Sequence, residues 1–194
     1  MMSGSALANT VTLTMDTGPA DVPVNGLSIS GVTFGFTIGG NPSSAATYNS
    51  QNGGTLTYID DPVILGPVAG VLHGSFASPT PVVEFGVGLT SFDTLTPGFT
   101  VSLFDAAHNS LGVFPVTTSP LLTLSEGKFS HSGAAVSSFD VSFNTTDIDD
   151  EIGEFAFDNL MFTTPSQSTP DAGATALLLA TSGAGIALLR RKLR

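Results

Sequence analysis

The chain has 194 residues, and 41% of them are hydrophobic, which supplies the core of one ordinary domain and excludes wholesale disorder. The 22 glycines and 12 prolines outnumber the 5 basic and 16 acidic residues together, a balance that favours short strands and turns over long helices. Cysteine is absent, which excludes disulfides, and residues 1–189 hold all 16 acidic residues and a single lysine, a net charge of −15 that argues against nucleic-acid binding.

The first segment, residues 1–8, ends in Ala6-Leu7-Ala8, the small-x-small pattern that precedes signal-peptidase cleavage sites. Neither a basic region nor an apolar core comes before this pattern. We therefore expect residues 1–8 to be the remnant of a signal peptide whose true start lies upstream. The alternative is a chance match in an alanine-rich chain.

Residues 9–163 alternate hydrophobic and polar side chains with the period of two that is typical of antiparallel strands buried on one face. Val83, Phe85, Val87 and Leu89 form the clearest such face. The pattern predicts an all-β fold, a two-sheet antiparallel sandwich that is jelly-roll-like, with a closed barrel as the alternative. Strands are predicted over residues 9–15, 26–37, 54–59, 69–77, 81–90, 98–105, 110–117, 121–130, 136–144 and 153–163.

Three features interrupt this alternation. The hydrophobic face changes phase at Ser30-Gly31, which predicts a β-bulge. Residues 38–53 are mostly polar and are predicted to form a long loop. The pair Asp158-Asn159 is predicted to make side-chain-to-backbone hydrogen bonds at an irregularity of the last strand.

The sequence shows no signature of catalysis. The three histidines are too far apart for a zinc motif, and no Gly-x-Ser-x-Gly nucleophile turn is present. His73, between Leu72 and Gly74, is expected to point outward from a strand. A carbohydrate-binding surface would need exposed tyrosines, because tryptophan is absent, and the candidates are Tyr48 and Tyr58. We therefore expect a protein that is not an enzyme, and keep a carbohydrate-binding module as the alternative function.

An acidic run before the last strand is the candidate metal site. Clustered carboxylates on a loop suit Ca²⁺, which prefers six to eight oxygen ligands. The alternative is a solvated acidic loop, which is common in so acidic a chain. The candidate ligands are Asp147, Asp149, Asp150, Glu151 and Glu154, with Asp60, Asp61, Asp158 and Asn159 as additional contributors.

The composition of the C-terminal part indicates a unit separate from the β-rich domain. Residues 164–169 form a Ser/Thr/Pro linker, and residues 170–194 contain an uncharged run, 176–189, followed by the basic residues Arg190, Arg191 and Lys192. A helix over residues 172–189 would be about 27 Å long, close to the roughly 30 Å hydrocarbon core of a membrane, with the basic residues on the cytoplasmic side. The alternatives are an amphipathic helix docked on the domain and a plain tail anchor.

This C-terminal arrangement resembles the PEP-CTERM sorting signal of bacteria, in the subtype that begins Val-Pro-Asp-Ser/Gly-Gly-Ser-Thr. Pro170, Asp171, Gly173 and Thr175 match that motif, whereas Thr169, Ala172 and Ala174 depart from it. The resemblance implies recognition and cleavage by an exosortase and delivery to the cell surface or extracellular matrix. Residues 98–105, 110–112 and 155–160 also resemble the surface domains that commonly precede this signal, which implies a sandwich fold and little about activity.

The sequence thus predicts a non-catalytic exported protein that is sorted to the cell surface. Its expected partners are a membrane, through residues 172–189, and an exosortase-type processing enzyme. The alternative is a surface module that binds polysaccharide or Ca²⁺. A hydrolase on the same fold is a third hypothesis, which no motif supports.

Overall fold

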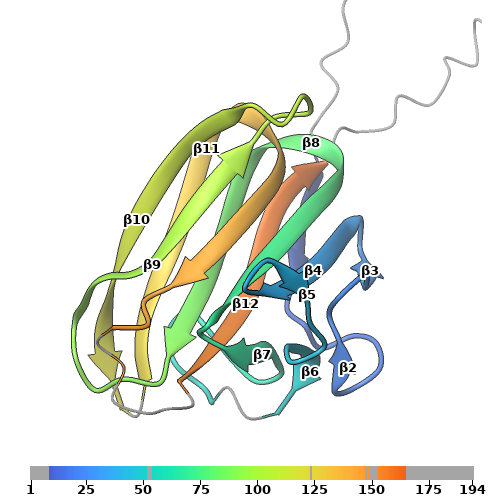
Figure 1. Cartoon of the computed structure of the whole chain (residues 1–194). Coiled ribbons are helices and arrows are strands. Elements are labelled where there is room, and N and C mark those ends of the chain that lie inside the picture. Colours follow the sequence, from blue (N-terminus) through green and yellow to red (C-terminus); the bar gives the residue numbers. More distant parts are fainter. Residues whose placement is uncertain (1–8, 52–53, 123, 147, 149–152, 165–194) are drawn as a thin grey trace, which may run out of the picture. The chain divides into compact units, whose positions relative to one another are not determined.

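A computed structural model describes residues 9–51, 54–122, 124–146, 148 and 153–164, and all regular elements among them are β-strands (Figure 1). The strands are antiparallel to their neighbours throughout. They are β1 (Asn9–Leu13), β2 (Val22–Pro23), β3 (Ser28–Ile29), β4 (Val32–Ile38), β5 (Asn41–Pro42), β6 (Thr47–Ser50), β7 (Val63–Pro67), β8 (Gly70–Leu89), β9 (Leu95–Phe104), β10 (Ser110–Leu121), β11 (Leu124–Phe143) and β12 (Glu154–Thr164).

Two long strands, β8 and β11, run through both layers of a sandwich. The first half of β8 pairs with β4 and with the second half of β11, which in turn pairs with β9. The second half of β8 pairs with β12 and with the first half of β11. Both strands curve over at the top of Figure 1, and Pro79 and Pro81 lie where β8 leaves the regular ladder.

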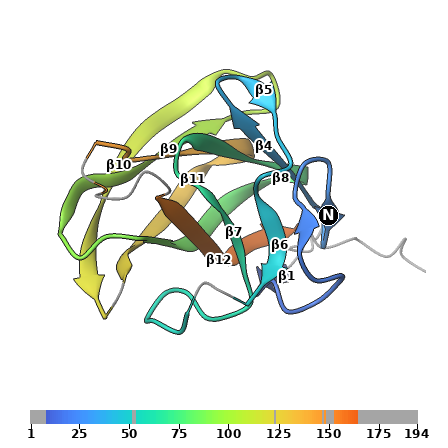
Figure 2. The same ribbon diagram turned by 60° about the horizontal axis from the view of Figure 1, so that its bottom comes forward.

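The two layers are therefore parts of one folded-over sheet. The first layer contains β5, β4, the first half of β8, the second half of β11, β9 and most of β10. The second layer contains the first half of β11, the second half of β8, β12, and then β1, β7, β6 and β2. Figure 2 shows β4 and β9 on one side, and β12, β7 and β6 on the other.

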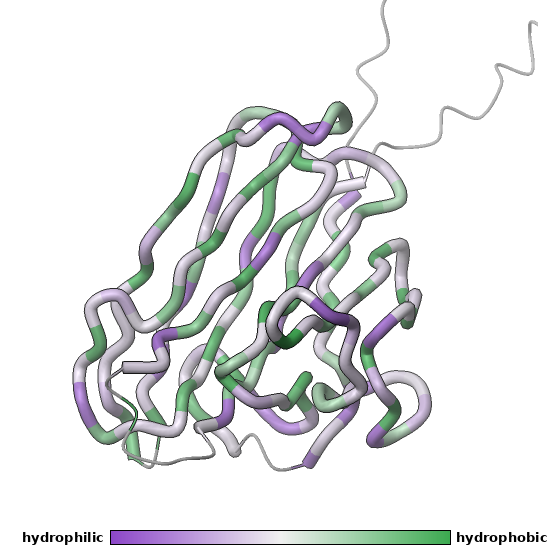
Figure 3. The backbone as a smooth tube through the Cα atoms, viewed as in Figure 1, coloured by the Kyte–Doolittle hydropathy of each residue, from purple (hydrophilic) through white to green (hydrophobic). Residues whose placement is uncertain are grey.

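Phenylalanine rings from both layers fill the space between them. Phe143 of the first layer stacks on Phe155 of the second at a centroid distance of 4.0 Å, and Phe85 packs on Phe139 at 5.5 Å. Hydrophobic and hydrophilic residues alternate along these strands (Figure 3). The predicted face Val83, Phe85, Val87 and Leu89 is buried, so the prediction of an antiparallel β-sandwich is confirmed.

The predicted bulge at Ser30-Gly31 was wrong. Ser28 pairs with Thr33 and Ile29 with Val32, so Ser30 and Gly31 are the two central residues of a hairpin turn. Both have positive φ, 51° and 85°, as a type I′ turn requires. The chain reverses its direction here, which changes the phase of the hydrophobic pattern without any bulge.

Several other predicted elements also need correction. The polar region 38–53 is not one long loop, because it contains β5 and β6, and Tyr48 within β6 is fully buried. Residues 54–59 form no strand, although their side chains alternate. The predicted strands 69–77 and 81–90 are one bent strand, β8, and 121–130 and 136–144 are joined in β11.

The predicted signal remnant (residues 1–8) and C-terminal sorting signal (residues 170–194) lie outside the described residues, as does the predicted linker from residue 165 onward. These include the sorting motif Pro170, Asp171, Gly173 and Thr175 and the basic stop Arg190, Arg191 and Lys192. Within the described part of the chain, no helix has the length and hydrophobicity needed to cross a membrane.

Candidate functional site

Residues 54–61, which we call the cover loop, lie on the outer face of the second layer. Small residues of the sheet make room for this loop, since a β-carbon on Gly86 would collide with the carbonyl oxygen of Tyr58 and one on Gly88 would meet Ile59 Cδ1 at 2.5 Å. Ile59 is buried against Val63 and Ala156 in a small apolar cluster separate from the main core. The loop therefore forms part of the folded structure despite having no regular secondary structure.

Polar groups of the sheet bind the backbone of the cover loop. The carboxylate of Glu126, only 7% exposed, accepts hydrogen bonds from Tyr58 N at 2.9 Å and from Thr57 N at 3.2 Å. Asn159 Nδ2 donates to Tyr58 O at 3.1 Å. Asp158 Oδ2 accepts from Asp60 N at 3.0 Å. Three side chains of the second layer thus fix the loop on both sides of Tyr58.

Asp158 and Asn159 sit at an irregularity of β12. The register with β8 shifts between Asp158 and Met161, and Asn159 has a φ of 56°. Side-chain-to-backbone hydrogen bonds at a strand irregularity were predicted here, and the bonds to Asp60 and Tyr58 confirm this. Asp158 is 1% exposed, and burial raises the pKa of its carboxyl group to about 7 despite the hydrogen bond from Asp60 N. Its second oxygen, Oδ1, is buried without a hydrogen-bond partner among the described residues.

A groove with two hollows flanks the exposed Tyr58 side chain, which is 39% accessible. One hollow, of about 240 Å³, extends to Thr12 and Met161 and is also lined by Asn159. The other, of about 410 Å³, extends to Ser119, Pro120 and Leu121. The two hollows share Thr57, Tyr58 and Lys128, and we call them together the Tyr58 groove.

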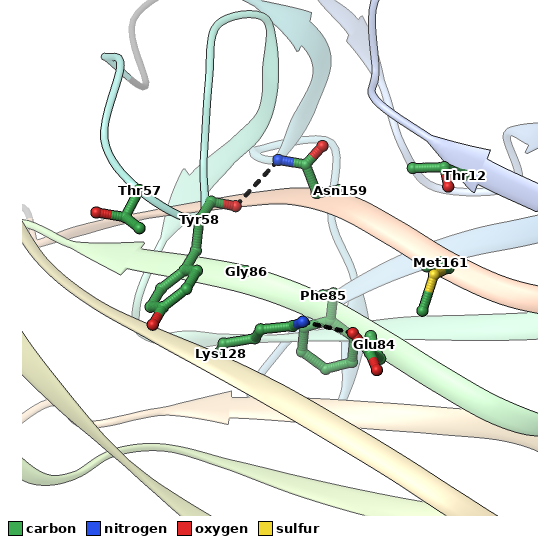
Figure 4. A pocket seen from close by; sticks show the side chains of 9 residues that line it. All are labelled: Thr12, Thr57, Tyr58, Glu84, Phe85, Gly86, Lys128, Asn159 and Met161. Atoms are coloured by element: carbon green, nitrogen blue, oxygen red, sulfur yellow. Dashed lines mark hydrogen bonds and ion pairs between the residues drawn. The ribbon is translucent and has the colours of Figure 1, made fainter.

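Lys128 lies in the floor of the Tyr58 groove, with the Tyr58 ring beside it (Figure 4). Its ammonium group forms an ion pair with Glu84 Oε2 at 2.5 Å, and Ser130 Oγ donates to Glu84 Oε1 at 3.1 Å. The hydrogen bond from Lys128 lowers the pKa of Glu84, so this carboxylate is ionised at neutral pH. The groove therefore combines one aromatic ring with several hydroxyl and charged groups, the composition of a site for a polar ligand with apolar faces.

A second polar cluster lies on the outer face of the first layer. His73 Nδ1 pairs with Asp140 Oδ1 at 2.7 Å, and His73 Nε2 lies 2.9 Å from Thr37 Oγ1. As predicted, His73 points outward from its strand. The connectivity is that of a hydroxyl, a base and an orienting carboxylate. However, β4 has β8 on one side and β5 on the other, so N–H groups near Thr37 are used in the ladder rather than directed at an oxyanion.

Of the five predicted metal ligands, the structure describes Glu154 alone. Asp147, Asp149, Asp150 and Glu151 lie outside the described residues, whereas Glu154 begins β12, where its N–H donates to Thr90 Oγ1 at 2.9 Å. In the part of the chain that the structure describes, no group of three or more His, Asp or Glu side chains is placed to hold a metal ion. Calcium binding by the acidic run stays a prediction.

The two tyrosines that were predicted as sugar contacts differ in their exposure. Tyr48 is fully buried and its hydroxyl donates to Thr17 O at 2.8 Å, whereas Tyr58 is exposed in the groove. Glu126, Glu84 and Lys128 were not singled out from sequence as site residues. The one available signal was that Lys128 is the only basic residue before position 190.

By sequence, the chain matches no protein-family model and no curated protein. Among solved structures, it is similar to a carbohydrate-binding module of family 29, with 10% identity and a TM-score of 0.43 over 85% of this chain and 95% of that one. It is also similar to the K2 cleaved adhesin domain of Lys-gingipain, with 10% identity and a TM-score of 0.46 over 80% of this chain and 100% of that one. These values are too low to assign a family or an activity.

Proposed function

We propose that this chain is a non-catalytic, exported surface protein whose β-sandwich binds polysaccharide in the Tyr58 groove. The observation that carries the proposal is the exposed Tyr58 ring, fixed through its backbone by Glu126 and Asn159 above a groove lined with polar side chains. Sugar rings present apolar C–H faces and hydroxyl edges, so an aromatic surface next to hydroxyl and charged groups is complementary to both.

The position of the groove supports an extended ligand. It crosses neighbouring strands from Thr12 of β1, through Met161 of β12 and Glu84 of β8, to Lys128 of β11 and Ser119 of β10. With a spacing of roughly 4.8 Å between strands, these five positions span about 19 Å. A stretch of several sugar rings fits this length better than a single ring does.

Binding to a panel of soluble neutral polysaccharides (a glucan, a mannan and a galactan), followed by affinity electrophoresis and by tyrosine fluorescence, tests this function. The chain has no tryptophan and two tyrosines, so the emission of Tyr58 can be identified with the Tyr58→Phe variant. Tyr58→Ala is expected to weaken binding by roughly tenfold or more, given what one aromatic contact contributes. Phe92→Ala is the matched control, because Phe92 is 74% exposed and does not line the groove. Wild-type affinity in Tyr58→Ala, or no binding by the wild-type protein to any member of the panel, would contradict the proposal.

We propose further that the C-terminal residues act as a PEP-CTERM-like sorting signal. The support is the order of the sequence features: the motif with Pro170, Asp171, Gly173 and Thr175, the uncharged run that ends at 189, and the basic residues that follow. Mass spectrometry of the protein from the cell-surface fraction tests this. A new C-terminus close to residues 170–175 is expected, and an intact Arg194 would contradict processing.

A further inference from the structure

The charges of the Tyr58 groove restrict which polysaccharides it can accept. Lys128 is the only basic residue among positions 1–189, and Glu84 neutralises it directly. Glu126 lines the second hollow and adds a negative charge, although its oxygens are occupied by the N–H groups of Thr57 and Tyr58. The groove therefore offers an incoming carboxylate no unpaired cation among the described residues that line it.

From this arrangement we infer that Glu84 is a specificity-determining residue: by neutralising Lys128, it makes the groove select neutral polysaccharides and reject those that carry uronic acids. The inference rests on the proposed function and names the class of polysaccharide that the same site takes. A uronate would meet Glu84 and Glu126 at close range, and the single positive charge is already paired. Specificity would then come from repulsion of the wrong ligand as well as from contacts with the right one.

The geometry around Glu84 supports a role beyond structural pairing. Glu84 is on the outer face of β8, opposite Ser130 of β11 and Met161 of β12, and its side chain is 24% exposed. Each of its oxygens has one partner, Lys128 for Oε2 and Ser130 for Oε1. An ion pair this exposed adds little to the stability of the fold. Its larger effect is therefore on the charge that a ligand meets in the groove.

A matched pair of ligands makes the test direct. The neutral polysaccharide of the panel that binds is compared with the same polysaccharide after oxidation of its C6 alcohols to carboxylates. The readout is the ratio of the two dissociation constants, because a loss of affinity that affects both ligands equally leaves this ratio unchanged. The wild-type protein is expected to bind the oxidised form at least roughly tenfold more weakly.

The variants then separate the charge of Glu84 from its shape. Glu84→Gln keeps the size of the side chain and frees the charge of Lys128, so the ratio is expected to shift by roughly tenfold toward the oxidised ligand at low salt and less at high salt. In Glu84→Gln combined with Lys128→Gln, this gain is expected to disappear. Ser130→Ala, which removes the other partner of Glu84 without a change of charge, is the control and leaves the ratio unchanged.

Three results would overturn the inference: equal affinity of the wild-type protein for both ligands, a ratio in Glu84→Gln within twofold of the wild-type ratio, or a gain that persists without Lys128. Failure of the proposed function itself has a different readout. In that case the wild-type protein retains no neutral polysaccharide, or Tyr58→Ala binds it normally, and both the function and the inference fall.

Discussion

Glu126 accepts a hydrogen bond from the backbone N–H of Tyr58 at 2.9 Å, although the two residues are separated by 68 positions in the chain. The buried carboxylate projects from the outer face of β11, and the tyrosine belongs to the cover loop above it. A loop residue with an exposed ring is in this way tied to a rigid strand. Such a ring is already placed before a ligand arrives, which reduces the ordering cost of binding.

The first prediction concerns this hydrogen bond. Glu126→Ala removes the acceptor of the Thr57 and Tyr58 N–H groups, so the cover loop should open more often and these two amides should exchange faster. A loss of about 1–3 kcal/mol in local stability is expected, since the bonds are made to a charged group. Hydrogen exchange measured by NMR checks this, and polysaccharide binding should weaken in parallel.

Glu126→Gln is the control for that experiment, because the amide oxygen can still accept a backbone hydrogen bond. Its exchange rates should lie between those of the wild-type protein and Glu126→Ala. Unchanged exchange at Thr57 and Tyr58 in the alanine variant would show that the carboxylate does not hold the loop.

The second prediction concerns the contact between Gly86 and Tyr58. Gly86→Ala places a methyl group where the carbonyl oxygen of Tyr58 now lies, so the cover loop must lift from the sheet and the ring must leave its position. Binding of the neutral polysaccharide is expected to fall by roughly tenfold or more, with a smaller loss of global stability. Gly35→Ala is the matched control, because a β-carbon there meets its neighbours at ordinary contact distances of 3.6–3.8 Å. Equal binding by both variants would contradict the role given to Gly86.

The long strands could be predicted because each buries one face, which appears in the sequence as a period of two. Short elements could not be recognised from this period. β6 has four residues, and its buried Tyr48 lies among polar neighbours, so the sequence indicated a loop. The hairpin turn at Ser30-Gly31 and a bulge both disturb the period in the same way, so the pattern alone could not distinguish them.

The candidate site could be predicted only in part, because its contacts join residues that are remote in the chain. Tyr58 was a candidate from composition, as one of two tyrosines. Its partners Glu126 and Asn159 are 68 and 101 positions away, and no local pattern marks such pairs. In residues 54–59, Leu56 and Tyr58 alternate with Thr55 and Thr57 as in a strand, but Tyr58 is exposed, whereas Leu56 and Ile59, three positions apart, contact the small apolar cluster. The N–H groups of Thr57 and Tyr58 bond to the side chain of Glu126 and not to a neighbouring strand.

The third prediction concerns the buried carboxyl of Asp158. Its pKa is about 7 in the folded protein, against a usual value of 3.8, so the folded state keeps a proton that the unfolded chain loses as the pH rises above about 4. The free energy of unfolding should therefore fall between about pH 4 and about pH 7, by at most about 4 kcal/mol from this group, and change little above that range. Urea denaturation at a series of pH values measures this decline.

Asp158→Asn removes the titrating group and keeps an oxygen that can accept the hydrogen bond from Asp60 N. This variant should be more stable than the wild-type protein at about pH 8, and its stability should decline less between about pH 4 and pH 7. Asp93→Asn, at an exposed position, is the control and should follow the wild-type profile. Parallel profiles for Asp158→Asn and the wild-type protein would contradict the assignment.

The fourth prediction distinguishes a structural role of the Thr37–His73–Asp140 cluster from a catalytic one. These side chains join β4, β8 and β11 on the outer face of the first layer, so His73→Ala should lower the free energy of unfolding by about 1–2 kcal/mol through loss of two hydrogen bonds. Because the Tyr58 groove is in the second layer, polysaccharide binding should stay at the wild-type level. Urea denaturation and affinity electrophoresis measure both effects, and hydrolysis of p-nitrophenyl acetate is assayed alongside. Ester hydrolysis by the wild-type protein that disappears in both Thr37→Ala and His73→Ala would make the cluster a reactive site and would contradict the non-catalytic function.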